Sequence, residues 1–315
     1  MNLSPIKIAI LIFLGIINGT ALMHGQKLES FEVTADWKNK INQLAPEGVQ
    51  DAPVQKPKIL LFSVSTGFYH WVIPHTDEVI KILAEKTGVF NVQQSNDINV
   101  FQKNELAKYD AIILNNNCPE RPRRNIFYDM LESDSNISEN KKLQLAAGYE
   151  ENLFDFVEKG GGLMAIHGGI IFLNENMKFS KMLGGSFDYH PKQQKIEVMP
   201  VDPDHPMVRA FNGEPLIHID EPYLFKNAYH DYHFRPLLWM DASELEGLKK
   251  PLKKNVQYVS WIKRFGEGRV FYVSPSHNAQ SFEDPRLLKY YLDGIMYVTG
   301  NLECDDSPLQ NHQNQ

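Results

Sequence analysis

The first half of the chain alternates short apolar runs with segments of helical spacing. The apolar runs are predicted strands, and they cover residues 58–63, 89–94, 110–115 and 163–166. Helices are expected over residues 77–86 and 143–159, with a short helical or irregular connection at 99–108. Apolar strands separated by helices are typical of a parallel sheet that is covered on both faces. The pattern therefore predicts an α/β fold with a doubly wound, mostly parallel sheet.

The second half of the chain predicts more strands than helices. Its strands are expected over residues 195–201, 257–263 and 269–274, and the last two form a hairpin through a glycine-rich turn. A closing helix is expected over residues 286–299. Residues 118–142 are polar and indicate a surface insertion. Its arginines, Arg121, Arg123 and Arg124, are more typical of a solvated segment than of an anion site.

Residues 1–25 have the features of a secretory signal peptide. Lys7 precedes an apolar run of about ten residues, from Ile8 to Ile17, and small residues follow. The run is too short for a membrane-spanning helix, which needs about 20 apolar residues. We therefore expect cleavage between Ala21 and Gln26 and an exported protein, either periplasmic or secreted.

Length and composition narrow the remaining classes. The 315 residues are 43% hydrophobic, which excludes a disordered chain. A net charge of −7 gives no electrostatic basis for binding nucleic acid, and no later segment is apolar enough to span a membrane. One domain over residues 58–300 fits this length. Residues 26–57 form a lead-in that either packs on the domain or stays loose, and a loose tail is expected over 301–315.

The cysteine count excludes further classes of site. Cys118 and Cys304 are too few for a disulfide scaffold or a four-cysteine metal centre. They are either inert thiols or a pair that joins in an oxidising compartment.

Histidines and amides follow several of the predicted strands. Because parallel strands end at the same edge of a sheet, where doubly wound folds bind ligands, we expect these residues to meet there. They are His70 after the first strand, Asn115, Asn116 and Asn117 after the third, His167 after the fourth, and His277 after the strand at 269–274.

His167 has the most specific setting of these residues. It lies between an apolar strand and Gly168-Gly169, which favours a sharp strand-to-helix turn that exposes one side chain above the sheet. A histidine in such a turn can bind a metal, transfer a proton or cap the turn.

Two later loops add candidates to this set. His190 lies at the mouth of a later strand, and Asp220 and Glu221 form a carboxylate pair close to Tyr223. Neighbouring side chains on an extended backbone point to opposite sides. We therefore expect Glu221 to face the site and Asp220 to face solvent or a backbone amide.

The order of these motifs resembles the ThuA-like (trehalose utilisation) family. The matching segments are residues 65–70, 160–169, 184–191, 204–206, 220–223 and 265–277. The resemblance implies a flavodoxin-like fold of the class I glutamine amidotransferase type, and a link to catabolism of trehalose or related, including oxidised, glycosides. It does not imply amidotransferase activity, because that chemistry needs a cysteine where this chain has His167.

The first functional hypothesis is an enzyme that acts on a small carbohydrate. Its candidate catalytic residues are His167, His70 and Glu221. Its candidate substrate contacts are Tyr69, Asn116 and Tyr223.

The cofactor and the alternatives depend on the same residues. A divalent metal such as zinc is one option, with His70, His167, His190 and His277 as candidate ligands. Acid and base catalysis by His167 and Glu221 without a metal is the other. The alternative function is a non-catalytic carbohydrate-binding module. A scaffold domain is a third hypothesis, and it predicts no cluster of histidines.

Overall fold

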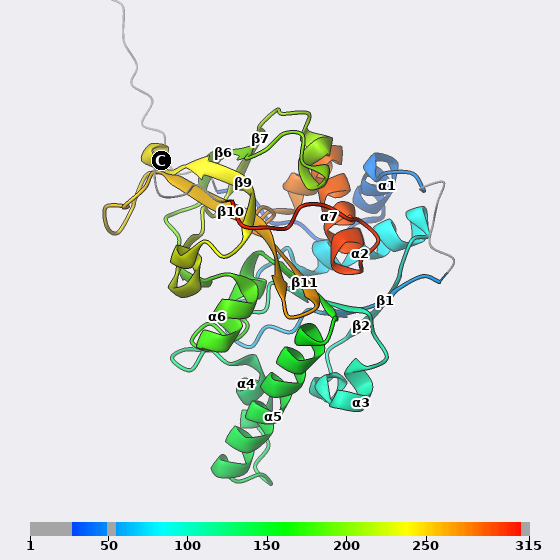
Figure 1. Ribbon diagram of the computed structural model, residues 1–315, viewed down its shortest axis with the longest axis vertical. Coiled ribbons are helices and arrows are strands. Elements are labelled where there is room, and N and C mark those ends of the chain that lie inside the picture. The colour runs from blue at the N-terminus through cyan, green and yellow to red at the C-terminus, as the bar shows by residue number, and fades with distance from the viewer. Residues whose placement is uncertain (1–26, 49–54, 310–315) are drawn as a thin grey trace, which may run out of the picture.

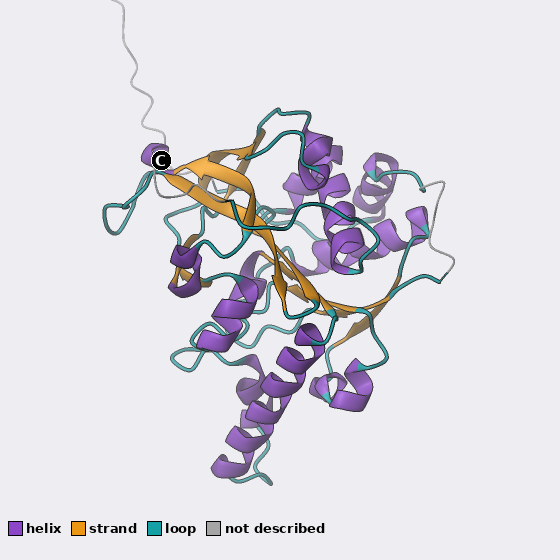
Figure 2. Ribbon diagram, viewed as in Figure 1, coloured by secondary structure: helices purple, strands orange, loops and turns teal. Residues whose placement is uncertain are grey.

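The computed structural model describes residues 27–48 and 55–309, and this part of the chain contains a nine-stranded mixed sheet (Figure 1, Figure 2). The strands are β1 (Lys58–Phe62), β2 (Asn91–Ser95), β3 (Ala111–Asn115), β4 (Gly162–Ile166), β6 (Gln194–Pro200), β7 (Leu216–Asp220), β9 (Arg235–Asp241), β10 (Val256–Phe265) and β11 (Gly268–Val273). Their order is β2-β1-β3-β4-β11-β10-β9-β6-β7. The pairings from β2 to β11 are parallel and the remainder are antiparallel. This is an α/β fold with a large parallel section and a β-rich second half.

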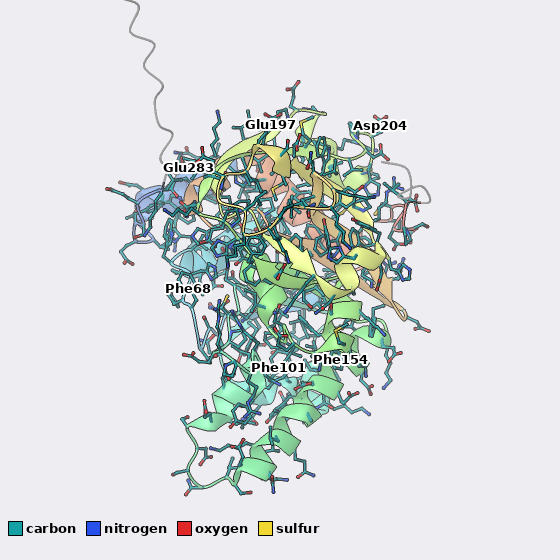
Figure 3. The ribbon with its side chains drawn as sticks, turned by 90° about the vertical axis from the view of Figure 1, so that its left-hand side faces the viewer. Phe68, Phe101, Phe154, Glu197, Asp204 and Glu283 are labelled. Carbon is teal, nitrogen blue, oxygen red and sulfur yellow. The ribbon has the colours of Figure 1, made fainter. Side chains whose placement is uncertain are left out.

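The parallel strands are buried on both faces because their side chains alternate between two helical layers. In β1, Ile59 and Leu61 belong to the core that includes α2 (Ile73–Thr87) and α7 (Pro285–Val298). Leu60 belongs to the opposite core, which includes residues of the other helices that cover the sheet. They include α4 (Ile126–Glu132), α5 (Glu139–Glu158) and α6 (Met177–Leu183). Phe101 and Phe154 of this second core lie in the lower part of Figure 3.

The segment expected as a polar insertion contributes to the core. Asn125 caps the amino end of α4, where its side chain accepts a hydrogen bond from the Tyr128 N–H. Ile126 and Phe127 on this helix are fully buried. The prediction of a surface insertion over residues 118–142 is therefore wrong for its central part. The short helical or irregular connection expected at 99–108 contains the short helix α3 (Lys103–Leu106).

Two pairs of strands shape the second half of the molecule. β10 and β11 form the expected antiparallel hairpin, and β11 also pairs in parallel with β4. The hairpin thus joins the parallel and antiparallel parts of the sheet. A separate two-stranded sheet of β5 (Ser186–Tyr189) and β8 (Leu224–Lys226) ends next to His190.

The lead-in packs on the domain through α1 (Ala35–Leu44). Trp37 and Ile41 of this helix are buried, and the Lys86 ammonium group donates to the Asn42 and Ala45 carbonyl groups at 2.6 Å. The predicted signal peptide lies outside the described residues. Among the helices that are described, none is long and apolar enough to cross a membrane.

The first residues of the tail contact the domain instead of extending freely. The Asp305 carboxylate lies 3.3 Å from the Arg235 guanidinium, and Asp306 accepts a hydrogen bond from the Tyr297 hydroxyl at 2.9 Å. The structure therefore differs from the expected loose tail at Asp305 and Asp306.

Candidate functional site

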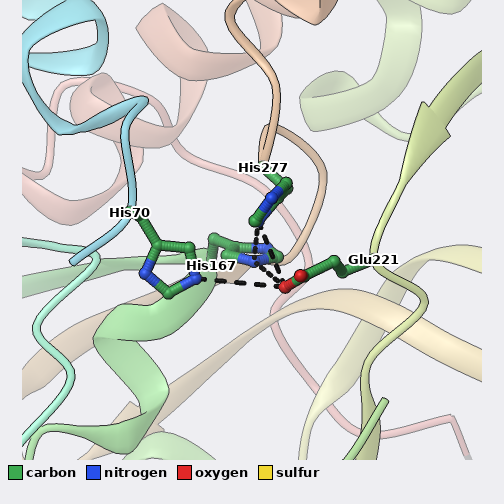
Figure 4. Close-up of side chains that lie close together, drawn as sticks. All are labelled: His70, His167, Glu221 and His277. Atoms are coloured by element: carbon green, nitrogen blue, oxygen red, sulfur yellow. Dashed lines mark hydrogen bonds and ion pairs between the residues drawn. The ribbon is translucent and has the colours of Figure 1, made fainter. Parts of the chain in front are cut away.

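Four side chains from four separate loops meet beside the carboxyl ends of the parallel strands (Figure 4). They are His70, His167, Glu221 and His277, and one donor atom of each lies within 4.8 Å of the other three. The Glu221 Oε2 atom is 3.1 Å from His277 Nδ1, 3.5 Å from His167 Nε2 and 4.0 Å from His70 Nε2. His167 Nε2 and His277 Nδ1 are 3.3 Å apart. We call these four residues the histidine cluster.

His70 is held by contact between the loops that follow β1 and β3. The Gly67 N–H donates to the Cys118 carbonyl at 2.8 Å. A Cβ atom on Gly67 would lie 2.6 Å from the Pro119 carbonyl oxygen, so a larger residue could not approach as closely. This contact fixes a loop whose His70 side chain is buried, with Nε2 facing the cluster.

His167 occupies a strained turn directly after β4. Its φ of 46° lies in the left-handed region, which non-glycine residues rarely adopt. A Cβ atom on Gly169 would lie 2.5 Å from the Leu114 carbonyl oxygen, so this glycine permits the tight turn. His167 Nδ1 lies 2.7 Å from the Ser274 carbonyl oxygen and donates to it. This hydrogen bond leaves the Nε2 lone pair directed at the cluster.

Asp220 positions the loops that carry Glu221 and His277. Its carboxylate accepts hydrogen bonds from the backbone N–H groups of Ser276 at 2.8 Å, His277 at 3.1 Å and Glu221 at 2.8 Å. The His218 Nδ1 atom lies 3.3 Å from the same carboxylate. Asp220 thus faces backbone amides while its neighbour Glu221 faces the imidazoles, which is the division expected from their adjacent positions.

The charge states of the cluster follow from burial and from its own contacts. Burial lowers the pKa of His70 well below its usual value, and the neighbouring histidines lower it further. Burial opposes ionisation of Glu221, but its interactions with His167 and His277 hold the pKa of this carboxyl well below its ordinary value. The site therefore combines a carboxylate with a neutral His70 imidazole, both of which can bind a cation.

The spacing of the donor atoms fits one metal ion. Nitrogen and oxygen ligands about 2.1 Å from a zinc ion lie about 3.4 Å apart in a tetrahedral site. The separations of 3.1, 3.3 and 3.5 Å among Glu221, His167 and His277 are close to this value. His70, at 4.0 Å from the carboxylate, needs only a small approach. The residues present therefore fit a divalent ion.

The other predicted site residues lie around this cluster in different environments. His190 Nε2 is 3.7 Å from Glu221 Oε2, but His190 is not one of the four residues whose donor atoms converge. The Tyr223 ring packs against His167 with centroids 4.1 Å apart, and its hydroxyl lies 3.5 Å from His70 Nε2. Tyr69 is 61% exposed on the same loop as His70.

The environment of Asn116 does not match the expected substrate contact. Its side chain is fully buried, donates to the Asn115 side-chain oxygen at 2.9 Å and accepts from the Gly168 N–H at 3.3 Å. In this structure the amide instead supports the loops after β3 and β4 through these hydrogen bonds.

Comparison with known proteins identifies the family. The model of the trehalose utilisation family, ThuA, matches residues 58–298. The chain belongs to the ThuA family. No curated protein matches it.

Solved ThuA-like structures share this fold at low sequence identity. A ThuA-like protein from Bacteroides uniformis is 16% identical, with a TM-score of 0.58, over 80% of this chain and 95% of that one. A ThuA-like protein from Parabacteroides merdae is also 16% identical, with a TM-score of 0.52, over 81% of this chain and 98% of that one. At this identity the likeness shows the fold alone.

The two cysteines of this ThuA protein differ in burial, since Cys118 is buried and Cys304 is partly exposed. Both thiols are free in the structure, and burial raises the pKa of Cys118 to about 12. A thiol must ionise to act as a nucleophile. Burial therefore disfavours the thiolate form of Cys118, whose Sγ atom lies 3.7 Å from His70 Nδ1.

Two positioning groups of the ThuA site were not predicted individually. The Ser274 backbone carbonyl orients His167. Any residue at that position would offer the same carbonyl, so the identity of residue 274 does not predict this role. Asp220 was expected to face either solvent or an amide. In the sequence, only the position of Asp220 next to Glu221 indicates that Asp220 supports the site.

We predict that Asp220→Ala destabilises the protein by at least about 3 kcal/mol, because three N–H groups lose their acceptor and each unsatisfied buried group costs about 1–3 kcal/mol. Asp220→Asn keeps an acceptor oxygen and should cost less. Urea unfolding measures both changes. Asp204, which is exposed on the outer surface in Figure 3, provides the matched control Asp204→Ala, with an expected change within about 0.5 kcal/mol. Equal stability of the Asp220→Ala and Asp204→Ala variants would contradict this positioning role.

Proposed function

We propose that this ThuA protein is an enzyme that acts on a small carbohydrate at a metal centre formed by the histidine cluster. The observation that carries the proposal is the convergence of four donor atoms from loops far apart in the sequence, at separations suited to one ion. Three imidazoles and a carboxylate suit a divalent transition metal, with zinc as the first candidate. A bound ion would polarise a keto or hydroxyl oxygen of the sugar or activate a water molecule.

Residues beside the cluster can hold and move protons during such chemistry. Burial raises the pKa of Tyr223 well above its usual value, so its hydroxyl keeps its proton and can donate a hydrogen bond to a ligand oxygen. His190 Nδ1 donates to the Pro191 carbonyl at 2.8 Å, which leaves Nε2 able to accept a proton. The His190 side chain is 34% exposed and therefore offers a route between this site and solvent.

The substrate class follows from the family and from the arrangement of the sheet. The family description, trehalose utilisation, favours trehalose or a related glycoside, including oxidised forms. We assign a flavodoxin-like arrangement to the parallel strands, because the order β2-β1-β3-β4-β11 follows the pattern 2-1-3-4-5. In such folds ligands bind outside the carboxyl ends of the strands, where the histidine cluster lies.

Metal binding tests the proposed centre directly. Calorimetric titration of chelator-treated protein with Zn²⁺ should give one ion per chain. The variant His167→Ala/His277→Ala loses two donors and should bind Zn²⁺ at least roughly 100-fold more weakly, since loss of one outer-shell partner alone costs about 10–100-fold. His233→Ala changes an exposed histidine and is the matched control, with unchanged affinity. Unchanged affinity in the double variant would show that the ion binds elsewhere.

Turnover separates the enzyme from a non-catalytic carbohydrate-binding module. Metal-loaded protein is mixed with trehalose, keto-oxidised trehalose and other disaccharides, with binding followed by calorimetry and products by chromatography. Glu221→Gln retains the side-chain shape but removes the charge, and should lower kcat for the converted sugar at least about 100-fold, the scale of a lost acid–base group. His233→Ala should keep the parent rate. Sugar binding without product in every mixture would identify a binding module.

We also propose that residues 1–25 direct export, on the basis of their charge and apolar pattern. The full chain, carrying a carboxyl-terminal tag, is produced in a bacterium with a periplasm, and the amino terminus of the tagged protein is sequenced. It should begin between residues 22 and 26, in the periplasmic or extracellular fraction. A tagged chain that keeps Met1 and remains in the cytoplasm would overturn the proposal.

A further inference from the structure

The three arginines near residue 120 have different surroundings in the folded chain. The Arg123 guanidinium lies 3.7 Å from the centre of the Tyr128 ring and 3.5 Å from the Glu139 carboxylate. Arg121 and Arg124 instead line a cleft of about 370 Å³. The cleft therefore contains two arginines that are not engaged, as Arg123 is, by the Tyr128 ring and the Glu139 carboxylate.

The cleft shares a wall with the histidine cluster. His190 lines the cleft, and its Nε2 atom lies 3.7 Å from Glu221 Oε2. Phe187 also lines it and contacts Tyr223, with ring centroids 4.6 Å apart. Since Tyr223 in turn packs against the His167 ring, the cleft and the cluster are neighbouring parts of one site.

The two carboxylates of the cleft already have partners. Glu175 lies 3.0 Å from the Lys226 ammonium group, and Asp188 lies 2.7 Å from that of Lys250. Each pair engages a carboxylate with a lysine, and Glu175 also interacts by its charge with Arg124, although it is not within 4.0 Å of that guanidinium.

Three cations of the cleft remain without a carboxylate partner within 4.0 Å in the described part of the chain: Arg121, Arg124 and Lys249. Arg124 is partly buried, and its charge opposes the rise in the pKa of Cys118 that burial causes. The Arg124 charge therefore affects the Cys118 thiol beside His70, while the same guanidinium lines the cleft. A partly desolvated, unpaired guanidinium is a strong and geometrically specific site for a carboxylate or phosphate.

We propose that this cleft binds the anionic group, a carboxylate or a phosphate, of a saccharide whose sugar ring reaches the histidine cluster. The volume lies at the low end of the range for small-molecule sites, about 300–1,000 Å³. The charged end of the ligand pairs with Arg124, Arg121 and Lys249, and His190 stands between that end and Glu221. The assignment of the ring to the cluster rests on the proposed function, whereas the recognition of the anion rests on the cleft alone.

Calorimetric titration of the purified chain with glucuronate, glucose 6-phosphate and glucose, at one low ionic strength, tests the proposal. At least one of the two charged sugars should bind at least about tenfold more tightly than glucose, and added salt should reduce this preference. Preference for glucuronate identifies a carboxylate ligand, and preference for glucose 6-phosphate identifies a phosphate. Equal affinity for all three sugars, or no binding, would overturn the proposal.

Variants locate the binding site. Arg124→Gln/Lys249→Gln should reduce the preference for the charged sugar about tenfold or more. Lys249→Gln alone changes an exposed side chain, cannot disrupt the core and should reduce the preference by a smaller factor. Arg123→Gln, next to the cleft residues but paired with Glu139, should retain the parent affinity. An unchanged preference in both Lys249 variants would place the anion elsewhere.

The same assay with His167→Ala/His277→Ala distinguishes this proposal from the metal centre. If the double variant loses Zn²⁺ but still binds the charged sugar, both proposals stand. If the parent chain binds no Zn²⁺ but binds the charged sugar through Arg124 and Lys249, the metal centre fails and the anion site stands. If Zn²⁺ binds and the charged sugar shows no preference, the anion site alone fails.

Discussion

The buried carboxylate of Asp220 connects the two halves of the molecule. β7, which ends at Asp220, is the outermost antiparallel strand of the sheet, whereas Ser276 and His277 follow β11 of the parallel part. By accepting the N–H groups of both residues, Asp220 holds the two loops together. Glu221, the next residue, then lies 3.1 Å from His277 although its strand lies at the edge of the sheet. The histidine cluster depends on these hydrogen bonds of Asp220, because they hold the Glu221 carboxylate beside the imidazoles.

Unfavourable backbone conformations surround the same site. Asn116, His167 and Ser276 follow three strands of the parallel part, and each has a positive φ, of 54°, 46° and 115°. Such conformations cost of order 1–3 kcal/mol each in non-glycine residues and persist only where the surroundings hold them. Here the Ile166 carbonyl accepts the Asn116 N–H, the Ser274 carbonyl accepts from His167, and Asp220 accepts the Ser276 N–H. These hydrogen bonds thus help to maintain the loops in the conformation that brings the donor atoms together.

The cluster and the neighbouring cleft differ in a way that suits different parts of one ligand. The cluster is mostly buried and combines the Glu221 carboxylate with three imidazoles. The cleft is open and carries cations that lack carboxylate partners. Enclosure strengthens electrostatic interactions at the reacting end of a ligand, while accessible cations attract its charged end from solvent. His190 belongs to the lining of the cleft and lies beside the cluster, so it connects these environments.

Local sequence determined the regular part of the fold and the positions where chemistry could occur. The continuous apolar runs of β1, β3 and β4 predict strands that are buried on both faces. Gly168-Gly169 after an apolar strand predicts the turn at His167. Since parallel strands end at one edge, the candidates His70, His167 and His277 also followed from local signals. Shorter elements could not be predicted from the same local patterns. β5 and β8 have only 4 and 3 residues, which is too short for a clear period, and the buried residues of α4 lie within a mostly polar segment.

Only the tertiary structure decided which candidates meet and what surrounds them. It joined Glu221 to histidines more than 50 residues away along the chain, left His190 beside them, and used Asn116 as an internal support. It also turned Arg121 and Arg124 toward a cleft while Arg123 paired elsewhere. The physical reason is one of range. Hydrophobic period and turn chemistry act over a few neighbouring residues, whereas distances between side chains depend on strand pairing and loop contacts between distant segments.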